Sequence, residues 1–149
     1  MRSRPLLTLR LNTAATQNIG AGPRGTRVTF PITGGSFEGD RLRGKVLPGG
    51  DDWTVKRPDG VVELDLRITL ETDDGALIYM TSFGLRHGPA EVLAALGRGE
   101  SVDLSTYYFR TAVRFETSAA QYAFLNRLIA VSSGNRLPSG PIYTIEEIL

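Results

Sequence analysis

Cysteine is absent from this chain of 149 residues, and histidine occurs once, as His87. Without cysteine there are no disulfide bonds, no thiolate catalysis and no cysteine metal sites. A single histidine also excludes the zinc and iron sites that use several imidazole ligands. We therefore expect no metal site and no cofactor.

An excess of charge is missing as well. Lys and Arg number 17 and Asp and Glu 16, so the formal net charge is +1. Nucleic-acid-binding proteins usually carry a strong basic excess, and none is present here. No apolar run approaches the roughly 18 residues of a membrane span. The basic start is followed only by the short run Leu6–Leu9, which is too brief for a signal peptide. We expect a cytoplasmic protein without nucleic-acid or membrane partners.

Glycine and proline are plentiful, at 17 and 8 residues, and they separate many short segments. This spacing is typical of strands joined by tight turns. Strands are predicted at 6–11, 26–32, 36–47 with breaks at Gly39 and Gly44, 53–57, 62–71, 76–83, 107–117, 128–131 and 142–148. Short helices are predicted at 89–96 and 118–126. The composition, 41% hydrophobic and 22% charged, suits one folded domain over residues 1–149.

The fold class that these segments favour is all-β and mainly antiparallel. A run of consecutive strands avoids exposed edges most simply by closing on itself. We therefore predict a closed β-barrel of about eight to ten strands with two short helices. A β-sandwich is the alternative.

Strict alternation over residues 62–71 supplies the first functional candidates. Its apolar members alternate with Glu63, Asp65, Arg67, Thr69 and Glu71. One interpretation is a solvated outer face, as half-exposed antiparallel sheets have. The other is a polar lumen, in which Asp65 and Arg67 project inward as an acid/base group beside a cationic donor.

The strand at 107–117 divides in the same way. Tyr108, Arg110, Ala112, Arg114 and Glu116 share one face, while Tyr107, Phe109, Thr111, Val113 and Phe115 share the other. The second set is a candidate core stripe, and the first is either a pocket wall or a salt-bridged surface. Arg110 suits an oxyanion ligand because its donors form a planar fork. Tyr79, on the hairpin partner of 62–71, is a candidate donor to a carbonyl, and Trp53 follows a glycine turn.

An ordered set of short motifs resembles the family called domain of unknown function 3237, which consists of uncharacterised small barrels from bacteria and fungi. The motifs are Ile32-Thr-Gly-Gly35, Phe37-Glu-Gly39, Leu47-Pro-Gly-Gly50 with Asp52-Trp53, Asp74-Gly75 with Ile78-Tyr79, Tyr108-Phe-Arg110, Phe115-Glu-Thr117, and Tyr122 with Leu125-Asn126. The resemblance implies a single antiparallel barrel that self-associates, as a homodimer or larger homo-oligomer. It implies no established activity. Phe124 departs from the family pattern, which often has Trp there.

The resemblance adds weight to residues in or beside these motifs: Asp52, Trp53, Asp65, Arg67, Tyr79, Arg110, Glu116 and Asn126. The first functional hypothesis is a cofactor-free acid/base enzyme, an isomerase, cyclase or lyase acting on a hydrophobic carbonyl or phenolic metabolite. Asp65 or Glu116 would be the base, and Arg67 or Arg110, with Tyr79, would hold the oxyanion. Substrate-binding candidates are Asp52, Trp53, Tyr108 and Asn126. The alternatives are a non-catalytic carrier of a small ligand and a structural or interaction barrel.

Overall fold

The computed structural model describes every residue from Met1 to Leu149. Its ten strands are β1 (Ser3–Thr13), β2 (Gln17–Gly22), β3 (Gly25–Glu38), β4 (Arg43–Val46), β5 (Gly50–Lys56), β6 (Val62–Thr72), β7 (Leu77–His87), β8 (Tyr108–Glu116), β9 (Ala130–Leu137) and β10 (Gly140–Ile148). The helical segments are α1 (Ala90–Gly97) and the 3₁₀ helices η1 (Leu104–Thr106) and η2 (Ala120–Arg127). No helix is both long enough and apolar enough to span a bilayer.

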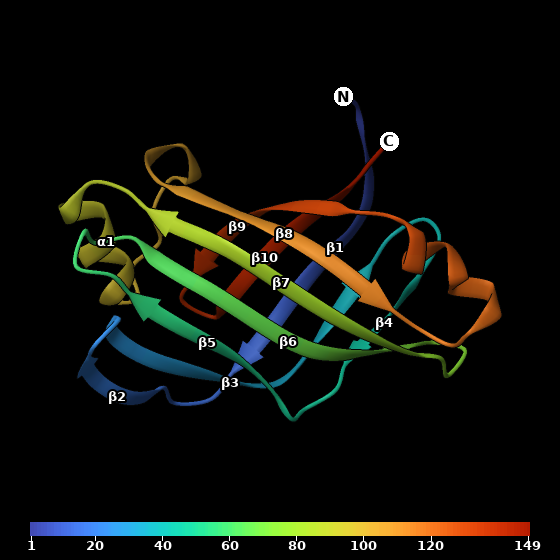
Figure 1. Cartoon of the computed structure of the whole chain (residues 1–149), viewed down its shortest axis with the longest axis horizontal. Coiled ribbons are helices and arrows are strands. Elements are labelled where there is room, and N and C mark those ends of the chain that lie inside the picture. The colour runs from blue at the N-terminus through green and yellow to red at the C-terminus, as the bar shows by residue number, and fades with distance from the viewer.

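The sheet closes into an antiparallel barrel (Figure 1). Neighbouring strands follow the order β1, β10, β9, β8, β7, β6, and then β5 and β3, and β3 pairs with β1 through residues Ile32 to Glu38. Eight strands make the ring, and two more lie outside it. The predicted closed barrel is confirmed, and the alternative sandwich is not formed.

The aliphatic row of β6 points into the barrel. Leu64, Leu66, Ile68 and Leu70 are all buried, and they join one core cluster with inward residues of the other strands. The candidate stripe of β8, from Tyr107 to Phe115, is also buried, as predicted. Because successive side chains of a strand alternate between faces, the polar row of β6 lies outside. The expectation that this row lines a polar lumen is therefore wrong.

The two ends of the barrel are closed differently (Figure 1). At one end, η2 inserts Leu125, which is fully buried, into the core. Near it the buried carboxylate of Glu147 accepts hydrogen bonds from Arg4 and Arg41, and the guanidinium of Arg41 lies 4.4 Å from the ring centre of Phe124. At the other end, α1 covers the opening through Leu96.

Several elements differ from the sequence prediction. The predicted strands at 26–32 and 36–47 are the continuous β3 and the short β4, and η1 is not predicted. β2 is not predicted, because its residues QNIGAG show no alternating apolar row. β9 extends to Leu137, whereas the prediction ends at residue 131. The second half of the strand was not predicted because it is polar and contains glycine. The predicted helix at 118–126 is the 3₁₀ helix η2, and no side chain caps its first turn. Periodicity does not detect β2 or the end of β9, because these residues form strands through hydrogen bonds with the neighbouring strands β3 and β10 and show no apolar alternation of their own.

Close approach of β4 to β6 depends on Gly44. A Cβ atom at this position would lie 2.0 Å from the carbonyl oxygen of Glu71. We expect Gly44→Ala to lower the free energy of unfolding by about 3 kcal/mol, because backbone atoms would have to move apart. Chemical denaturation measures the change. Gly22→Ala is the matched control, since its Cβ would meet only an oxygen 4.0 Å away. Equal stability of the two variants would contradict the close pairing.

Candidate functional site

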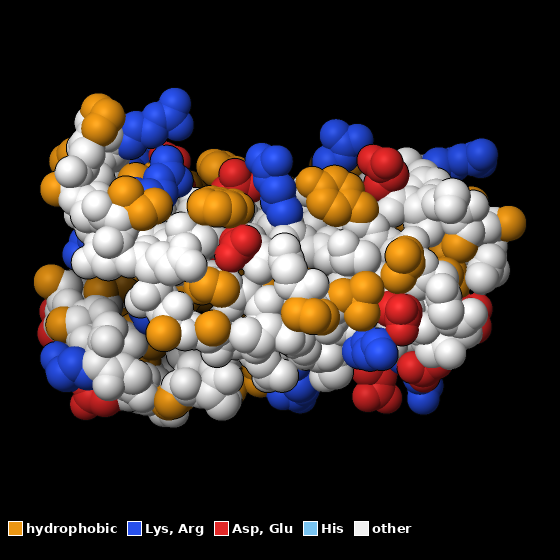
Figure 2. Space-filling model, turned by 90° about the horizontal axis from the view of Figure 1, so that it is seen from below, with side chains coloured by type: hydrophobic (Ala, Val, Ile, Leu, Met, Phe, Trp, Pro, Cys, Tyr) orange, Lys and Arg blue, Asp and Glu red, His pale blue; other side chains and the backbone are white.

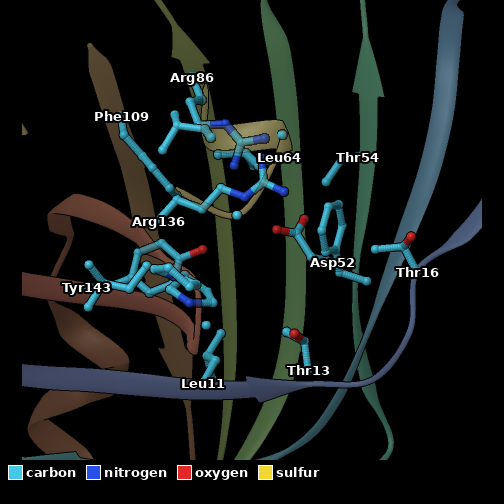
Figure 3. Close-up of a pocket in the computed structure, with 18 of the residues that line it drawn as sticks. Leu11, Thr13, Thr16, Asp52, Thr54, Leu64, Arg86, Phe109, Arg136 and Tyr143 are labelled. Atoms are coloured by element: carbon cyan, nitrogen blue, oxygen red, sulfur yellow. The ribbon is translucent and has the colours of Figure 1, made fainter. Parts of the chain in front are cut away.

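A cavity of about 220 Å³ opens at the α1 end of the barrel. Figure 3 shows its walls, which come from β1, β3, β5, β6, β7, β8, β9 and β10. Its lining residues are Leu11, Thr13, Thr16, Phe30, Ile32, Asp52, Thr54, Leu64, Arg86, Leu96, Gly97, Gly99, Glu100, Phe109, Arg136, Leu137, Pro138, Gly140, Pro141 and Tyr143. The cavity is therefore mainly apolar, with a few charged groups, as small-molecule sites usually are.

Asp52 is the buried acid of this cavity, and 7% of it is exposed. It lies on β5, whose inward row also contains Thr54. The backbone N–H of Asp65 donates a hydrogen bond of 3.0 Å to its Oδ1 atom, and no side chain forms an ion pair with it. Burial raises the pKa of Asp52 from the ordinary 3.8 to about 6, although this N–H and the charge of Arg86 act in the opposite direction. Asp52 can thus exchange a proton close to neutral pH.

Two guanidiniums face Asp52 across the cavity. Figure 3 shows the side chains of Arg86, from β7, and Arg136, from β9, directed toward its carboxylate. Arg86 is only 8% exposed. Burial, and then the charge of Arg136, lower the pKa of Arg86 to about 10, and burial also lowers the pKa of Arg136. Both remain cations at neutral pH, so the site holds two fixed positive charges.

Aromatic rings surround these charges. The guanidinium carbon of Arg86 lies 5.6 Å from the ring centre of Phe109, and that of Arg136 lies 5.7 Å from Phe30 on the opposite wall. Tyr143 meets Phe109 edge to face, with ring centres 5.4 Å apart. Burial raises the pKa of Tyr143 far above its ordinary value, so its phenol stays protonated. The walls therefore suit a flat, partly apolar ligand.

Buried hydroxyl groups link three neighbouring strands of the barrel. Ser82, Thr111 and Ser132 form a buried chain of hydroxyl hydrogen bonds between β7, β8 and β9, at 2.7 and 2.6 Å. Next on β9 comes Gly134, where a Cβ atom would lie 2.4 Å from the Phe109 ring. Beyond them, the hydroxyl of Tyr107 accepts a 2.9 Å hydrogen bond from the backbone N–H of Arg136 and so fixes that end of β9.

Four of the five predicted catalytic residues, Asp65, Arg67, Tyr79 and Glu116, lie together on the outside of the barrel, and the fifth, Arg110, lies apart from them. Arg67 Nε is 3.4 Å from Asp65 Oδ1, and the side chains are 58% and 42% exposed. The neighbouring Tyr79 is 41% exposed and pairs across the strands with Glu116, which is also exposed. None of these four side chains lines the cavity. Their catalytic roles stay predictions that the position of the cavity does not support.

The other candidates separate in the same way. Trp53, Tyr108 and Arg110 are exposed on outer faces, with the Arg110 guanidinium carbon 5.5 Å from the Tyr108 ring centre. Asn126 ties η2 to β8, because its side-chain amide exchanges hydrogen bonds of 2.8 and 2.9 Å with the backbone of Thr117. Of the predicted binding residues only Asp52 lies in the cavity. Figure 2 shows acidic, basic and apolar side chains interspersed on one outer face. The predicted self-association remains untested.

Arg86, Arg136 and Tyr143 are absent from the sequence-based candidates. A signal for Arg86 exists, because it continues the inward row of Ile78, Met80 and Ser82 on β7. Arg136 lies in the part of β9 that periodicity does not detect. No group of three or more acidic or histidine side chains is close enough to hold a metal ion. The charged groups of the cavity are thus suited to proton transfer and anion binding.

The closed barrel with a cavity at one end places this protein in the class of small antiparallel β-barrels. A family model described as "Protein of unknown function (DUF3237)" matches residues 1–148. The chain belongs to this family, as the resemblance of its motifs suggested.

Relatives extend the comparison. The UPF0311 protein RPA1785 of Rhodopseudomonas palustris is 40% identical over 125 residues, which cover 84% of this chain and 82% of the relative. Its crystal structure matches with a TM-score of 0.96 and 35% identity, covering 99% and 97% of the two chains.

Fungal proteins are more distant. PR-toxin biosynthesis cluster protein 7 of Penicillium roqueforti is 27% identical over 126 residues, covering 72% of this chain and 68% of the relative. The crystal structure of an enzyme from Penicillium herquei has a TM-score of 0.74 at 20% identity and covers 99% and 94% of the chains, which shows the shared fold.

Replacing Asp52 tests the electrostatics of the cavity. The pKa of about 6 in the folded chain, against 3.8 ordinarily, means that folding favours the protonated acid. Ionisation therefore costs about 3 kcal/mol of stability, a cost absent below pH 3.8 and complete above pH 6. We expect Asp52→Asn to unfold at a higher temperature than the parent at pH 8, and the gain to vanish near pH 3.5.

Asp73→Asn, at an exposed turn residue, is the matched control. Calorimetry at several pH values measures both variants. A gain for Asp52→Asn that does not change with pH would contradict a buried, uncompensated carboxylate.

Proposed function

We propose that this barrel is a cofactor-independent enzyme that transfers a proton within a small, partly apolar metabolite bearing a carbonyl or phenolic oxygen. The observation that carries the proposal is the buried carboxylate of Asp52. It has a pKa of about 6 and lies in a cavity with two guanidiniums that form no ion pair. An acid/base group works best when its pKa lies near the working pH.

Asp52 is the proton carrier in this proposal. Its Oδ1 atom is held by the Asp65 backbone N–H, which leaves Oδ2 free toward the cavity. In its ionised form it accepts a proton from a carbon or hydroxyl of the substrate, and it returns the proton at another position. Isomerisation, cyclisation and elimination of water all fit this sequence of events. None consumes a co-reactant, and in the elimination the proton leaves with the hydroxyl group as water.

Arg86 stabilises the charge that forms when the proton leaves. The substrate oxygen becomes an enolate or phenolate, and a fixed guanidinium in a partly buried site attracts it more strongly than water does. The protonated phenol of Tyr143, which also lines the cavity, is a further donor in this proposal. These groups replace the Arg67, Arg110 and Tyr79 of the sequence-based hypothesis, while the chemistry remains the same.

The fungal relatives support an enzymatic role for this kind of barrel. One is described as an enzyme and the other belongs to a biosynthesis cluster, and both resemble this chain over most of its length. A carrier function is the alternative, and it would need the same cavity and arginines without proton transfer.

Deuterium exchange tests the proposal without knowledge of the natural substrate. The protein is incubated in D₂O with phenylpyruvate or phenylacetone, and NMR follows loss of the C–H signal next to the carbonyl. We expect exchange faster than in buffer, with a rate that rises with pH through about 6 as Asp52 ionises. Asp52→Asn should lower the enzymatic rate by about 100-fold or more and remove this inflection.

The control is Asp73→Asn, which should exchange at the rate of the parent. Exchange no faster than buffer with both ketones, or equal rates for the parent and Asp52→Asn, would contradict the proposal. Binding of either ketone without exchange would favour a carrier.

A further inference from the structure

Arg86 and Arg136 form no ion pair, although the carboxylate of Asp52 shares their cavity. The seven ion pairs of the chain all involve other residues. No side chain or carbonyl accepts a hydrogen bond from either guanidinium, while both line the cavity. Burying a cation without a partner costs free energy, and a bound anion would offset that cost.

We propose that Arg86 and Arg136 form a carboxylate subsite, so that the substrate is a small carboxylic acid with a flat apolar body. This inference rests on the proposed function for its use of the same cavity. A guanidinium presents a planar fork of donors that matches the two oxygens of a carboxylate. Arg86 comes from β7, and Arg136 reaches from β9 toward Phe30 on β3, so the two donors converge from different strands.

Charge balance favours a single negative charge over a phosphate. With Asp52 ionised, the two arginines leave the inner cavity at +1, and a carboxylate makes it neutral. A phosphate dianion would make it negative beside a buried aspartate. The carboxyl-terminal end of α1 lies at the mouth and also disfavours further negative charge, whereas Glu100 there is paired with Arg98.

The apolar walls place the rest of the ligand. Phe30, Phe109 and Tyr143 lie beside the two guanidiniums, and Leu11 and Leu64 line the same space. An aromatic or branched acid would put its carboxylate on the arginines and its body against these side chains.

Calorimetric titration with matched probes tests the subsite. The probes are phenylacetate, its neutral isostere phenylacetamide, and inorganic phosphate, each added to the parent protein and to Arg86→Gln and Arg136→Gln. We expect phenylacetate to bind at least about 10-fold more tightly than the amide or phosphate, and each substitution to weaken it by about 10-fold or more. Arg127→Gln, at an exposed residue of η2, should change nothing.

Several outcomes would overturn the inference. These are equal binding of acid and amide, phosphate binding as tight as that of phenylacetate, or full affinity in both arginine variants. Circular dichroism confirms that each variant is folded. If Arg86→Gln is unfolded, Arg136→Gln and Arg86→Lys decide the question, since lysine keeps the charge but not the fork.

The Asp52→Asn variant separates this subsite from the proposed function. It should bind phenylacetate at least as tightly as the parent, because one negative charge has been removed. Binding that depends on the arginines while exchange is absent would leave the subsite standing and overturn the proton-transfer function. If deuterium exchange depends on Asp52 but the protein binds phenylacetate no more tightly than phenylacetamide, the proton-transfer function stands and the carboxylate subsite is overturned.

Discussion

Pairing between β1 and β3 closes the sheet, and the rest of the molecule depends on this closure. Once the ring is complete, every strand must present one row of side chains to a lumen of limited volume. Aliphatic rows such as that of β6 fill most of it. At the η2 end the row of β10 ends in Glu147, whose carboxylate is paired with arginines, whereas at the α1 end the rows end in Asp52, Arg86 and Arg136, and the cavity lies there. The location of the site thus follows from where the apolar rows end.

Buried charge is handled in opposite ways at the two ends of the barrel. Near η2, burial acts to raise the pKa of Glu147, but hydrogen bonds from Arg41 and Arg4 hold it below its ordinary value. That carboxylate is compensated and closes the barrel end. In the cavity, Asp52 is buried without an ion pair and its pKa is raised instead. This contrast makes the α1 end the candidate site, because strongly shifted pKa values often occur at functional sites.

Much of the fold could be predicted from the sequence, whereas little of the site could. Alternation identified β6 and β8 because their rows are long and strictly periodic. β2 and the end of β9 were missed because their residues are small or polar and become strands only through their neighbours. Among the site residues, Asp52 was a candidate because it adjoins a family motif. Arg86 was hidden in an apolar row, where a single polar residue gives no periodic signal.

Local order along the chain was enough to predict strands, turns and an all-β fold, and to offer carboxylates and arginines as candidate chemical groups. It was not enough to say which row of a strand faces inward, because a period of two is the same on both faces. Closure of the ring made that choice by burying the leucines of β6 and leaving Asp65 and Arg67 in water. It also brought Asp52, Arg86 and Arg136 together from three separate strands, since only the wrapped sheet places their inward rows around one cavity.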